Sequence, residues 1–425
     1  MSTDVLTNPA QMRQQNATSV LKAVRTFGPM SRSDVAKRTG LSKPTVNEIV
    51  SSLLFQGYLD EAHAPATERQ RPGPKASQLT FVSNVGFVLG IDLSLYKIAV
   101  TLADLNGVAR GSILVPVEPG QRRTARTFVG AVDRAVGRVL QQVGVARDDI
   151  WRVCLGVPGA FDPESGSIRL APTLAQWRDV PLGTMLRELF SCPVLIENEV
   201  HLSVLAEQRW GGAKDVRDAV YFHAGIGLAL GLLIDGKIYR GADGIAGEIG
   251  YMLGATSEAP DHSDFGAFEW SAGGLAFTRL AQKAIAEGRG LHLLRRAGGQ
   301  ADAIDAKLVF AAAREGDTAA AEIVDTIVER LAIGIANICC ILNPAVVILG
   351  AGLAQAGADL LHPLQARVAA LSPMPPRHFT VSELGPQAVI LGAVEHALRA
   401  VEAARFNLFA DLSEQPSKTR EAAVA

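Results

Sequence analysis

Hydrophobic positions near the start of the chain recur with the period of an α-helix, from Asn16 to Glu61. Two serines suited to cap helices, Ser31 and Ser42, divide this stretch, and Gly40 predicts a tight turn between them. The pattern therefore predicts three short helices with these inner residues: Val20, Leu21 and Val24; Val35 and Ala36; and Val46, Ile49, Val50 and Leu53.

The outer face of the third predicted helix is polar and consists mostly of short side chains. Its candidate DNA-binding residues are Lys43, Pro44, Thr45, Asn47, Glu48 and Ser51. Short polar side chains let a helix approach base edges closely, and Asn47 can pair with adenine in the major groove. The pattern favours a helix-turn-helix whose third helix reads DNA.

A basic segment with a Pro-Gly turn follows these helices at residues 69–75, and the alternating residues 78–81 come next. Arg69, Arg71 and Lys75 can form a wing, or an arm that enters a minor groove. Helix-turn-helix pairs also occur in proteins that do not bind DNA, and basic Pro/Gly segments also serve as linkers. The wing at this distance from the helices favours the DNA-binding interpretation.

From Phe87 the chain becomes β-rich and is punctuated by glycines. Residues 88–92 predict a buried strand with residues 97–104 as its hairpin partner, and residues 219–237 repeat this strand–turn–strand theme. The duplication predicts two related α/β lobes with a cleft between them, where ligands commonly bind. Helices are predicted at residues 127–143, 182–190, 200–210, 274–286, 319–342 and 392–404.

Composition and charge agree with a multidomain protein that meets DNA at one end. The 425 residues are too many for one ordinary core, and 48% hydrophobic with 20% charged residues is typical of a globular protein. Residues 1–80 carry ten Lys and Arg against six Asp and Glu, a net charge of +4. The remainder carries 31 against 37, a net charge of −6, so the N-terminal part is the surface suited to phosphates.

Other features predict a cytoplasmic protein without membrane contact. The N-terminus lacks the apolar core of a signal peptide. The most apolar stretch, residues 331–354, is interrupted by Asn337, Asn343 and Pro344, so it predicts a buried helix, a turn and a buried strand. The four cysteines show no CxxC spacing and no disulfide framework.

Several short motifs follow one another in a characteristic order along the body. They are Gly90-Ile91-Asp92, Gly156-Val157-Pro158-Gly159, Trp177-Arg178-Asp179-Val180-Pro181-Leu182, Glu197-Asn198, Gly244-Ile245-Ala246-Gly247-Glu248-Ile249-Gly250 and Asn343-Pro344-Ala345-Val346-Val347-Ile348-Leu349-Gly350. In their order and spacing the chain resembles the ROK family of bacterial sugar kinases and sugar-responsive repressors. It is most similar to the transcriptional-regulator branch, with its xylose and N-acetylglucosamine repressors.

The resemblance implies a fold class and a division into domains. An all-α winged helix-turn-helix precedes a two-lobed α/β domain of the actin-like, duplicated ribonuclease H-like type found in sugar kinases. The implied parts are a DNA-binding domain at 1–80, a first lobe at 87–199 and a second lobe at 200–385. A C-terminal helix at 386–405 returns to the first lobe, and a disordered tail covers 406–425.

Three positions differ from the pattern that the family's kinases use to handle phosphate. The glycine-rich turn after the first aspartate is replaced by Asp92-Leu93-Ser94-Leu95-Tyr96-Lys97, in which Tyr96 is bulky. Ile226 stands at the threonine of the second phosphate loop, and Glu199 stands at the catalytic aspartate. Without glycines the backbone cannot approach phosphate, and moving a catalytic carboxylate by roughly 1 Å can cost about a hundredfold in rate.

These departures imply a body with no catalytic residue, no kinase activity and no cofactor. The alternative is an active ATP-dependent sugar kinase with an appended regulatory DNA-binding domain. The family's zinc site is not matched either: Tyr251 replaces its histidine, and its three cysteine positions fall near Pro260, His262 and Ala267. Because a structural zinc ion needs four ligands, no metal is expected.

Sugar-contacting positions of the family are partly kept. The candidate effector-binding residues are Thr173, Asn198, Glu199, Glu248 and Glu269. Amides and carboxylates suit vicinal diols, and Trp177 or Trp270 offers a face for a sugar ring. Thr173, Glu199 and Tyr251 depart from the asparagine, aspartate and histidine of the family, and Glu248 could instead cap a helix.

The sequence therefore predicts a DNA-binding transcriptional regulator, most simply a repressor of sugar uptake and catabolism genes. Its expected partners are a double-stranded, pseudo-palindromic DNA operator and a small-molecule effector, a sugar or a sugar derivative. A homodimer or higher homo-oligomer suits two recognition helices about one DNA turn apart. A third possibility is a DNA-binding protein whose body only dimerises.

Overall fold

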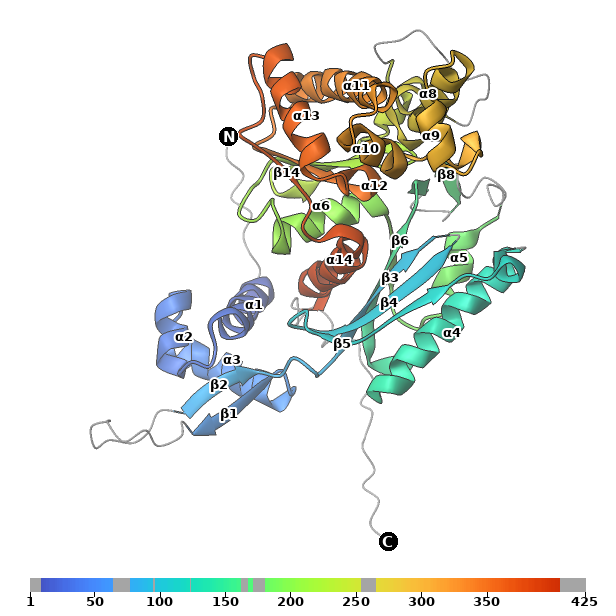
Figure 1. Cartoon of the computed structure of the whole chain (residues 1–425). Helices are drawn as coiled ribbons and strands as arrows, with labels where there is room; N and C mark the ends of the chain where they lie inside the picture. Colours follow the sequence, from blue (N-terminus) through green and yellow to red (C-terminus); the bar gives the residue numbers. More distant parts are fainter. Residues whose placement is uncertain are drawn as a thin grey trace, which may run out of the picture.

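The computed structural model describes residues 9–63, 77–94, 96–122, 124–161, 167–170, 180–253 and 265–405. Its first part is a small domain set apart from two larger lobes (Figure 1). This domain holds three helices, α1 (Pro9–Phe27), α2 (Arg32–Thr39) and α3 (Lys43–Phe55), and the antiparallel hairpin of β1 (Leu59–His63) and β2 (Ser77–Phe81). A winged helix-turn-helix is therefore present, as predicted.

The predicted caps set the ends of these helices. The Ser31 hydroxyl accepts a hydrogen bond from the Asp34 N–H at 3.2 Å, and the Ser42 hydroxyl accepts one from the Thr45 N–H at 3.3 Å. Gly40 ends α2 with a φ of 72°, which favours glycine. All nine inner residues predicted for the three helices are buried.

The helical pattern was wrong at its far end. Helix α3 stops at Phe55, and Leu59 begins β1, which pairs with β2 from Leu59 opposite Phe81 to His63 opposite Ser77. Leu59 is apolar and faces the core in either conformation, so periodicity alone could not separate the two. Backbone hydrogen bonds in both directions between Met30 and Leu79 tie the wing to the helices.

The first lobe is a five-stranded sheet with the order β5-β4-β3-β6-β9. Its strands are β3 (Phe87–Leu93), β4 (Lys97–Asp104), β5 (Ala109–Pro116), β6 (Ile150–Val157) and β9 (Val194–Asn198). Alternate residues of β3 face opposite sides: Leu89 and Ile91 pack with α4 (Ala125–Val143), whereas Val88 packs with α14 (Ala388–Arg405). Short elements β7 (Ala160–Phe161), β8 (Ile168–Leu170) and α5 (Leu182–Arg187) complete this lobe.

The second lobe repeats this plan with the strand order β12-β11-β10-β13-β14. Its strands are β10 (Ala219–Ala224), β11 (Leu228–Ile234), β12 (Lys237–Ile238), β13 (Val346–Gly350) and β14 (His378–Val381). One face packs against α6 (Glu199–Trp210), and the other against α8 (Gly274–Ala286), α11 (Thr318–Leu342) and α13 (Ala358–Leu371). In both lobes an antiparallel hairpin pairs its first strand in parallel with a later strand, which confirms the predicted duplication.

Several elements of the second lobe were not predicted. Helices α7 (Ala267–Ala272), α9 (Leu291–Arg296), α10 (Ala306–Arg314) and α12 (Ala351–Ala354) are short, so few turns were available to establish a helical period. The 14-residue helix α13 was also not predicted, and it contains Pro363, a residue that usually marks the end of a helix. The apolar stretch at 331–354 does form a buried helix end, a turn at Asn343 and the buried strand β13. Among the described residues, none of the helices is long and apolar enough to span a bilayer.

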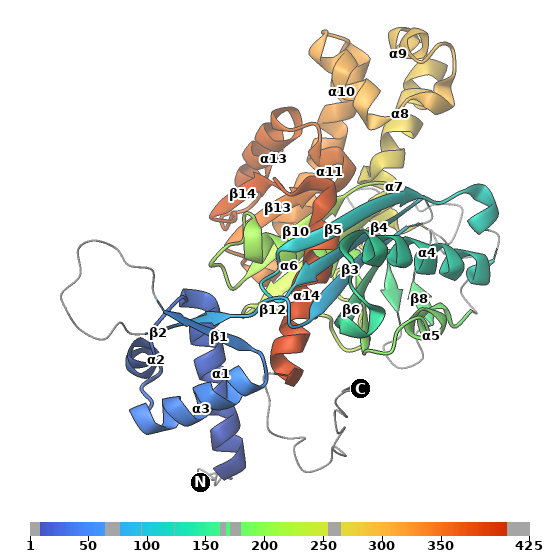
Figure 2. The same ribbon diagram turned by 90° about the horizontal axis from the view of Figure 1, so that it is seen from below.

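Helix α14 lies between α6 and the sheet of the first lobe, and its far end approaches α1 (Figure 2). The predicted tail at 406–425 lies outside the described residues. The chain thus forms three compact parts joined by one C-terminal helix that contacts each of them.

Candidate functional site

The outer face of α3 is the first candidate site. Lys43, Pro44, Asn47, Glu48 and Ser51 are exposed. Thr45 is half-buried, and its hydroxyl lies 2.7 Å from that of Ser42. The structure therefore brings all six predicted residues of this helix to one polar face.

Partners of this face are few and weak within the domain. Arg32 approaches Asn47 at 3.5 Å, but its stronger contacts are the two hydrogen bonds it donates to Glu61 of β1, at 3.0 and 2.8 Å. Glu48 forms an exposed ion pair with Arg13 at 3.7 Å. Predicted wing residues Arg69, Arg71 and Lys75 lie outside the described residues.

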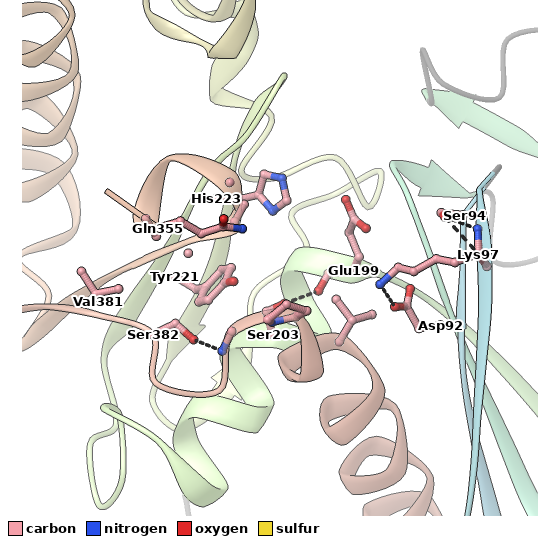
Figure 3. Close-up of a pocket in the computed structure, with 17 residues that line it drawn as sticks. Asp92, Ser94, Lys97, Glu199, Ser203, Tyr221, His223, Gln355, Val381 and Ser382 are labelled. Atoms are coloured by element: carbon pink, nitrogen blue, oxygen red, sulfur yellow. Dashed lines mark hydrogen bonds and ion pairs between the residues drawn. The ribbon is translucent and has the colours of Figure 1, made fainter. Parts of the chain in front are cut away.

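A cleft of about 320 Å³ between the two lobes is the second candidate site (Figure 3). It lies at the ends of β3 and β13, where ligands bind in many open α/β folds. The first lobe supplies Asp92, Ser94 and Lys97, and α6 supplies Glu199 and Ser203. Facing them across the cleft are second-lobe side chains that include Tyr221, His223 and Gln355.

Two described N–H groups of the turn between β3 and β4 are already engaged within the turn. The Ser94 hydroxyl accepts hydrogen bonds from the N–H groups of Tyr96 and Lys97, at 3.2 and 3.1 Å. Phosphate cradles depend on such N–H groups pointing at the ligand. Lys97 forms an ion pair with the buried Asp92 at 2.9 Å, so its charge is also engaged.

The turn between β10 and β11, at residues 225–227, presents an apolar side chain. Ile226 is 65% exposed, and neighbouring Gly225 uses its own backbone to contact Gly227 and Gly274. A branched hydrocarbon side chain offers no hydrogen bond to a phosphate. This turn therefore exposes a hydrocarbon side chain.

Glu199 is a carboxyl group at the cleft whose pKa is raised. Burial, followed by the neighbouring carboxylate of Asp92, raises its pKa to about 7, while Lys97 opposes the rise. Carboxyl groups tuned to this range work as acids or bases near neutral pH. The cleft therefore holds one carboxyl group whose pKa lies in this range.

Three of the predicted effector residues form a polar cluster beside the cleft, with Asn198 and Glu269 buried and Glu248 half-buried. The Asn198 side-chain amide donates to Glu248 at 3.4 Å, and its oxygen accepts from the Val200 N–H at 3.0 Å, which caps α6. Glu269 accepts hydrogen bonds from the N–H groups of Gly266 and Leu228, at 2.8 and 3.4 Å. We refer to Asn198, Glu248 and Glu269 as the carboxyl cluster.

Burial is the main cause of raised pKa values in this cluster. It raises the pKa of Glu248, helped by the charge of Glu269, and it raises the pKa of Glu269 despite the two backbone hydrogen bonds. Glu199, the fourth described effector residue, lines the cleft next to the cluster. Thr173 lies outside the described residues.

Of the two predicted aromatic platforms, the structure describes Trp270. One side of the Trp270 ring is covered by the Arg279 guanidinium, 4.5 Å from the ring centroid. Trp177 lies outside the described residues, as do Pro260 and His262 of the unmatched zinc motif. Tyr251 lies in a 3-10 turn and Ala267 begins α7, and within the described ranges no three His, Cys, Asp or Glu side chains gather as metal ligands do.

Sequence reasoning missed a buried ionic network beneath the cleft. Glu197 of β9 pairs with His201 at 2.8 Å and accepts from the Arg240 Nε at 2.8 Å, and His396 of α14 lies 3.9 Å away. Burial opposes ionisation of Glu197, but His201 and Arg240 outweigh it and lower its pKa to about 2. The i,i+4 spacing of Glu197 and His201 was the available signal; the other partners come from distant segments.

Comparison with known proteins assigns the family. The ROK family model matches residues 88–400, and the IclR helix-turn-helix domain model matches residues 15–62. The chain therefore belongs to the ROK family, as the sequence predicted.

Individual relatives include both regulators and an enzyme. The chain is similar to a xylose repressor from Caldicellulosiruptor bescii, with 28% identity covering 91% of this chain and 96% of the relative. It is also similar to a glucokinase from Thermotoga maritima, with 30% identity covering 66% and 86%. A solved ROK family transcriptional regulator, a homologue of the Escherichia coli MLC protein, shares the fold with a TM-score of 0.73, 20% identity and coverage of 93% and 99%.

Proposed function

We propose that the protein is a transcriptional repressor that binds operator DNA through α3 and the wing, and that its body senses a sugar without phosphorylating it. The observation that carries the proposal is the polar face of α3, which is exposed and makes few contacts within its own domain. A capped helix with such a face, followed by a basic wing, suits the major groove. Similarity to the xylose repressor over nearly the whole chain supports the same function.

The expected DNA contacts are those predicted from the sequence. Lys43 and the wing residues Arg69, Arg71 and Lys75 neutralise phosphates, and Asn47 contacts a base edge. Thr45, Glu48 and Ser51 complete the reading face, with Pro44 fixing the first turn. A homodimer would present two such helices to a pseudo-palindromic site, and an operator near sugar uptake and catabolism genes is expected.

The carboxyl cluster with Glu199 and Thr173 is the proposed effector site. Carboxyl and amide groups form bidentate hydrogen bonds with the hydroxyls of a sugar, and the adjacent cleft leaves room for a small ligand. A sugar that prefers one arrangement of the lobes would shift the equilibrium between them, and DNA affinity with it.

The proposal also states that the body has no kinase activity. Ser94 engages the amides of the first turn, and Ile226 replaces a polar side chain in the second. The opposing observation is Glu199, whose pKa of about 7 suits a general base. An ATP-dependent sugar kinase is therefore the second candidate, and the glucokinase similarity supports it.

Two assays on the full chain test these proposals. Selection of genomic fragments by the purified protein should enrich a palindromic site, and one of D-xylose, D-glucose or N-acetyl-D-glucosamine should release it. A coupled assay with the same sugars and ATP should give no turnover. Turnover that disappears in Glu199→Ala would establish the kinase instead. If no sugar alters DNA binding and none raises the melting temperature of the protein, a body that only dimerises would be favoured.

A further inference from the structure

Helix α14 touches the cleft at one end and the DNA-binding domain at the other. Val389 in its first turn lines the cleft, as does Pro386 just before the helix. Glu402 near its last turn forms an ion pair with Arg25 of α1. Its 18 residues span about 27 Å at roughly 1.5 Å per residue, so one rigid element joins the two sites.

Close packing leaves α14 little freedom to move independently of its neighbours. A Cβ at Gly392 would lie 1.9 Å from the carbonyl oxygen of Leu202 in α6. A Cβ at Gly90 of β3 would lie 2.8 Å from the Val394 side chain. Gly392 brings the backbone of α14 directly against that of α6, and Gly90 lets Val394 of α14 pack directly on β3. Movement of α6 against the first sheet therefore displaces α14 as well.

The middle of α14 meets the ionic network that bridges the two lobes. Glu197 belongs to the first sheet, whereas its partner Arg240 follows β12 of the second sheet. His396 of α14 lies 3.9 Å from the same carboxylate. A change in the angle between the lobes therefore changes contacts that α14 itself makes.

Arg25 is well placed to pass such a displacement to the DNA-binding domain. Its side chain is only 14% exposed, and its guanidinium lies 6.0 Å from the centroid of the Phe81 ring, which packs against the α14 core. A partly buried pair is screened less by solvent than an exposed one. Because α1 packs against α2 and α3, moving α1 reorients the reading helix.

We propose that α14 couples the cleft to the DNA-binding domain and that the Arg25–Glu402 ion pair is the coupling contact. The inference rests on the proposed function and names its regulatory element. Coupling between two binding sites is reciprocal, so DNA bound at α3 changes the affinity of the cleft for its ligand by the same factor as that ligand changes the affinity for DNA. This reciprocity allows a test that needs no identified effector.

The test measures hydrogen exchange at the backbone amides of residues 350–355, which line the cleft, with and without the genomic DNA fragment that the wild-type chain selects. DNA should change exchange at least twofold in the wild type, and Glu402→Gln should remove most of that change. The charge-swapped double variant Arg25→Glu/Glu402→Arg should restore it. Asp359→Asn removes a matched ion pair, with Arg314 at 2.8 Å on the second lobe, and should behave as wild type.

The possible outcomes distinguish a failure of the proposed coupling through α14, called the link below, from a failure of the proposed repressor function. A change of equal size in the wild type and Glu402→Gln, or no change in a wild type that binds DNA, would overturn the link and leave the repressor intact. A loss in Glu402→Gln that the charge swap fails to restore would overturn the ion pair as the coupling contact. A wild type that selects no DNA would overturn the proposed function together with this inference.

Discussion

The face of α3 and the carboxyl cluster handle polar side chains in opposite ways. On α3, residues such as Lys43 and Asn47 project into solvent and are held by the helix beneath them. In the carboxyl cluster, Asn198 and Glu269 are buried, Glu248 is half-buried, and all three side chains bond to one another or to backbone N–H groups. Polar groups on the first surface can be exchanged with little effect on folding, whereas those in the second also support the fold.

The largest expected effect is on DNA binding, from the double variant Lys43→Ala/Arg71→Ala. Loss of two phosphate contacts should weaken DNA affinity about tenfold to several hundredfold and lower the slope of log affinity against log salt by about 2. Unfolding free energy should change by less than about 0.5 kcal/mol, because Lys43 lies exposed on α3 and surface substitutions have small effects on stability. Fluorescence anisotropy at several salt concentrations measures the DNA affinity and its salt slope, and urea unfolding measures the free energy of unfolding. Lys237→Ala on the body is the matched control.

Next in size is the loss of stability expected for Glu269→Ala. The substitution leaves the buried N–H groups of Gly266 and Leu228 without their acceptor. Each buried N–H group without an acceptor should lower the free energy of unfolding by about 1–3 kcal/mol. Urea unfolding measures the change. A variant as stable as the wild type would mean that Glu269 does not stabilise the fold and is available to bind a ligand.

Glu199 should make stability depend on pH in a defined direction. Its pKa is raised from 4.5 to about 7 on folding, so the folded state binds the proton more tightly than the unfolded state. The resulting stabilisation is fully present below about pH 4.5 and is lost as the pH rises through 7. The difference in unfolding free energy between Glu199→Gln and the wild type should therefore move in favour of the variant as the pH rises from 5 to 8. A difference that does not change with pH would contradict the raised pKa of Glu199.

The smallest expected effect is that of the Ser42→Ala substitution. Removing the hydroxyl that accepts from the Thr45 N–H should cost the DNA-binding domain about 1 kcal/mol, the usual value for a helix N-cap. Hydrogen exchange within α3 measures the local loss. Ser51→Ala, on the exposed face of the same helix, is the control and should leave exchange unchanged.

The sequence predicted local features better than contacts between distant segments. Ser31, Gly40 and Ser42 mark helix ends through chemistry within a few residues, and the structure has those ends. The meeting of Glu197 with Arg240 and His396 depends on how three separate segments pack, and no short-range pattern encodes it. Likewise, family resemblance located Glu269 but could not show that two backbone N–H groups already occupy its carboxylate.

The most direct test of the central claim is one titration of the selected genomic fragment with the full chain, repeated in the presence of each sugar, with and without ATP. We expect nanomolar-range binding typical of specific regulators, roughly 10⁻⁸ M or tighter. One sugar should weaken it equally with and without ATP, and no sugar phosphate should form. Binding that ignores every sugar, or release that requires ATP and produces sugar phosphate, would contradict a repressor with a sensing but non-phosphorylating body.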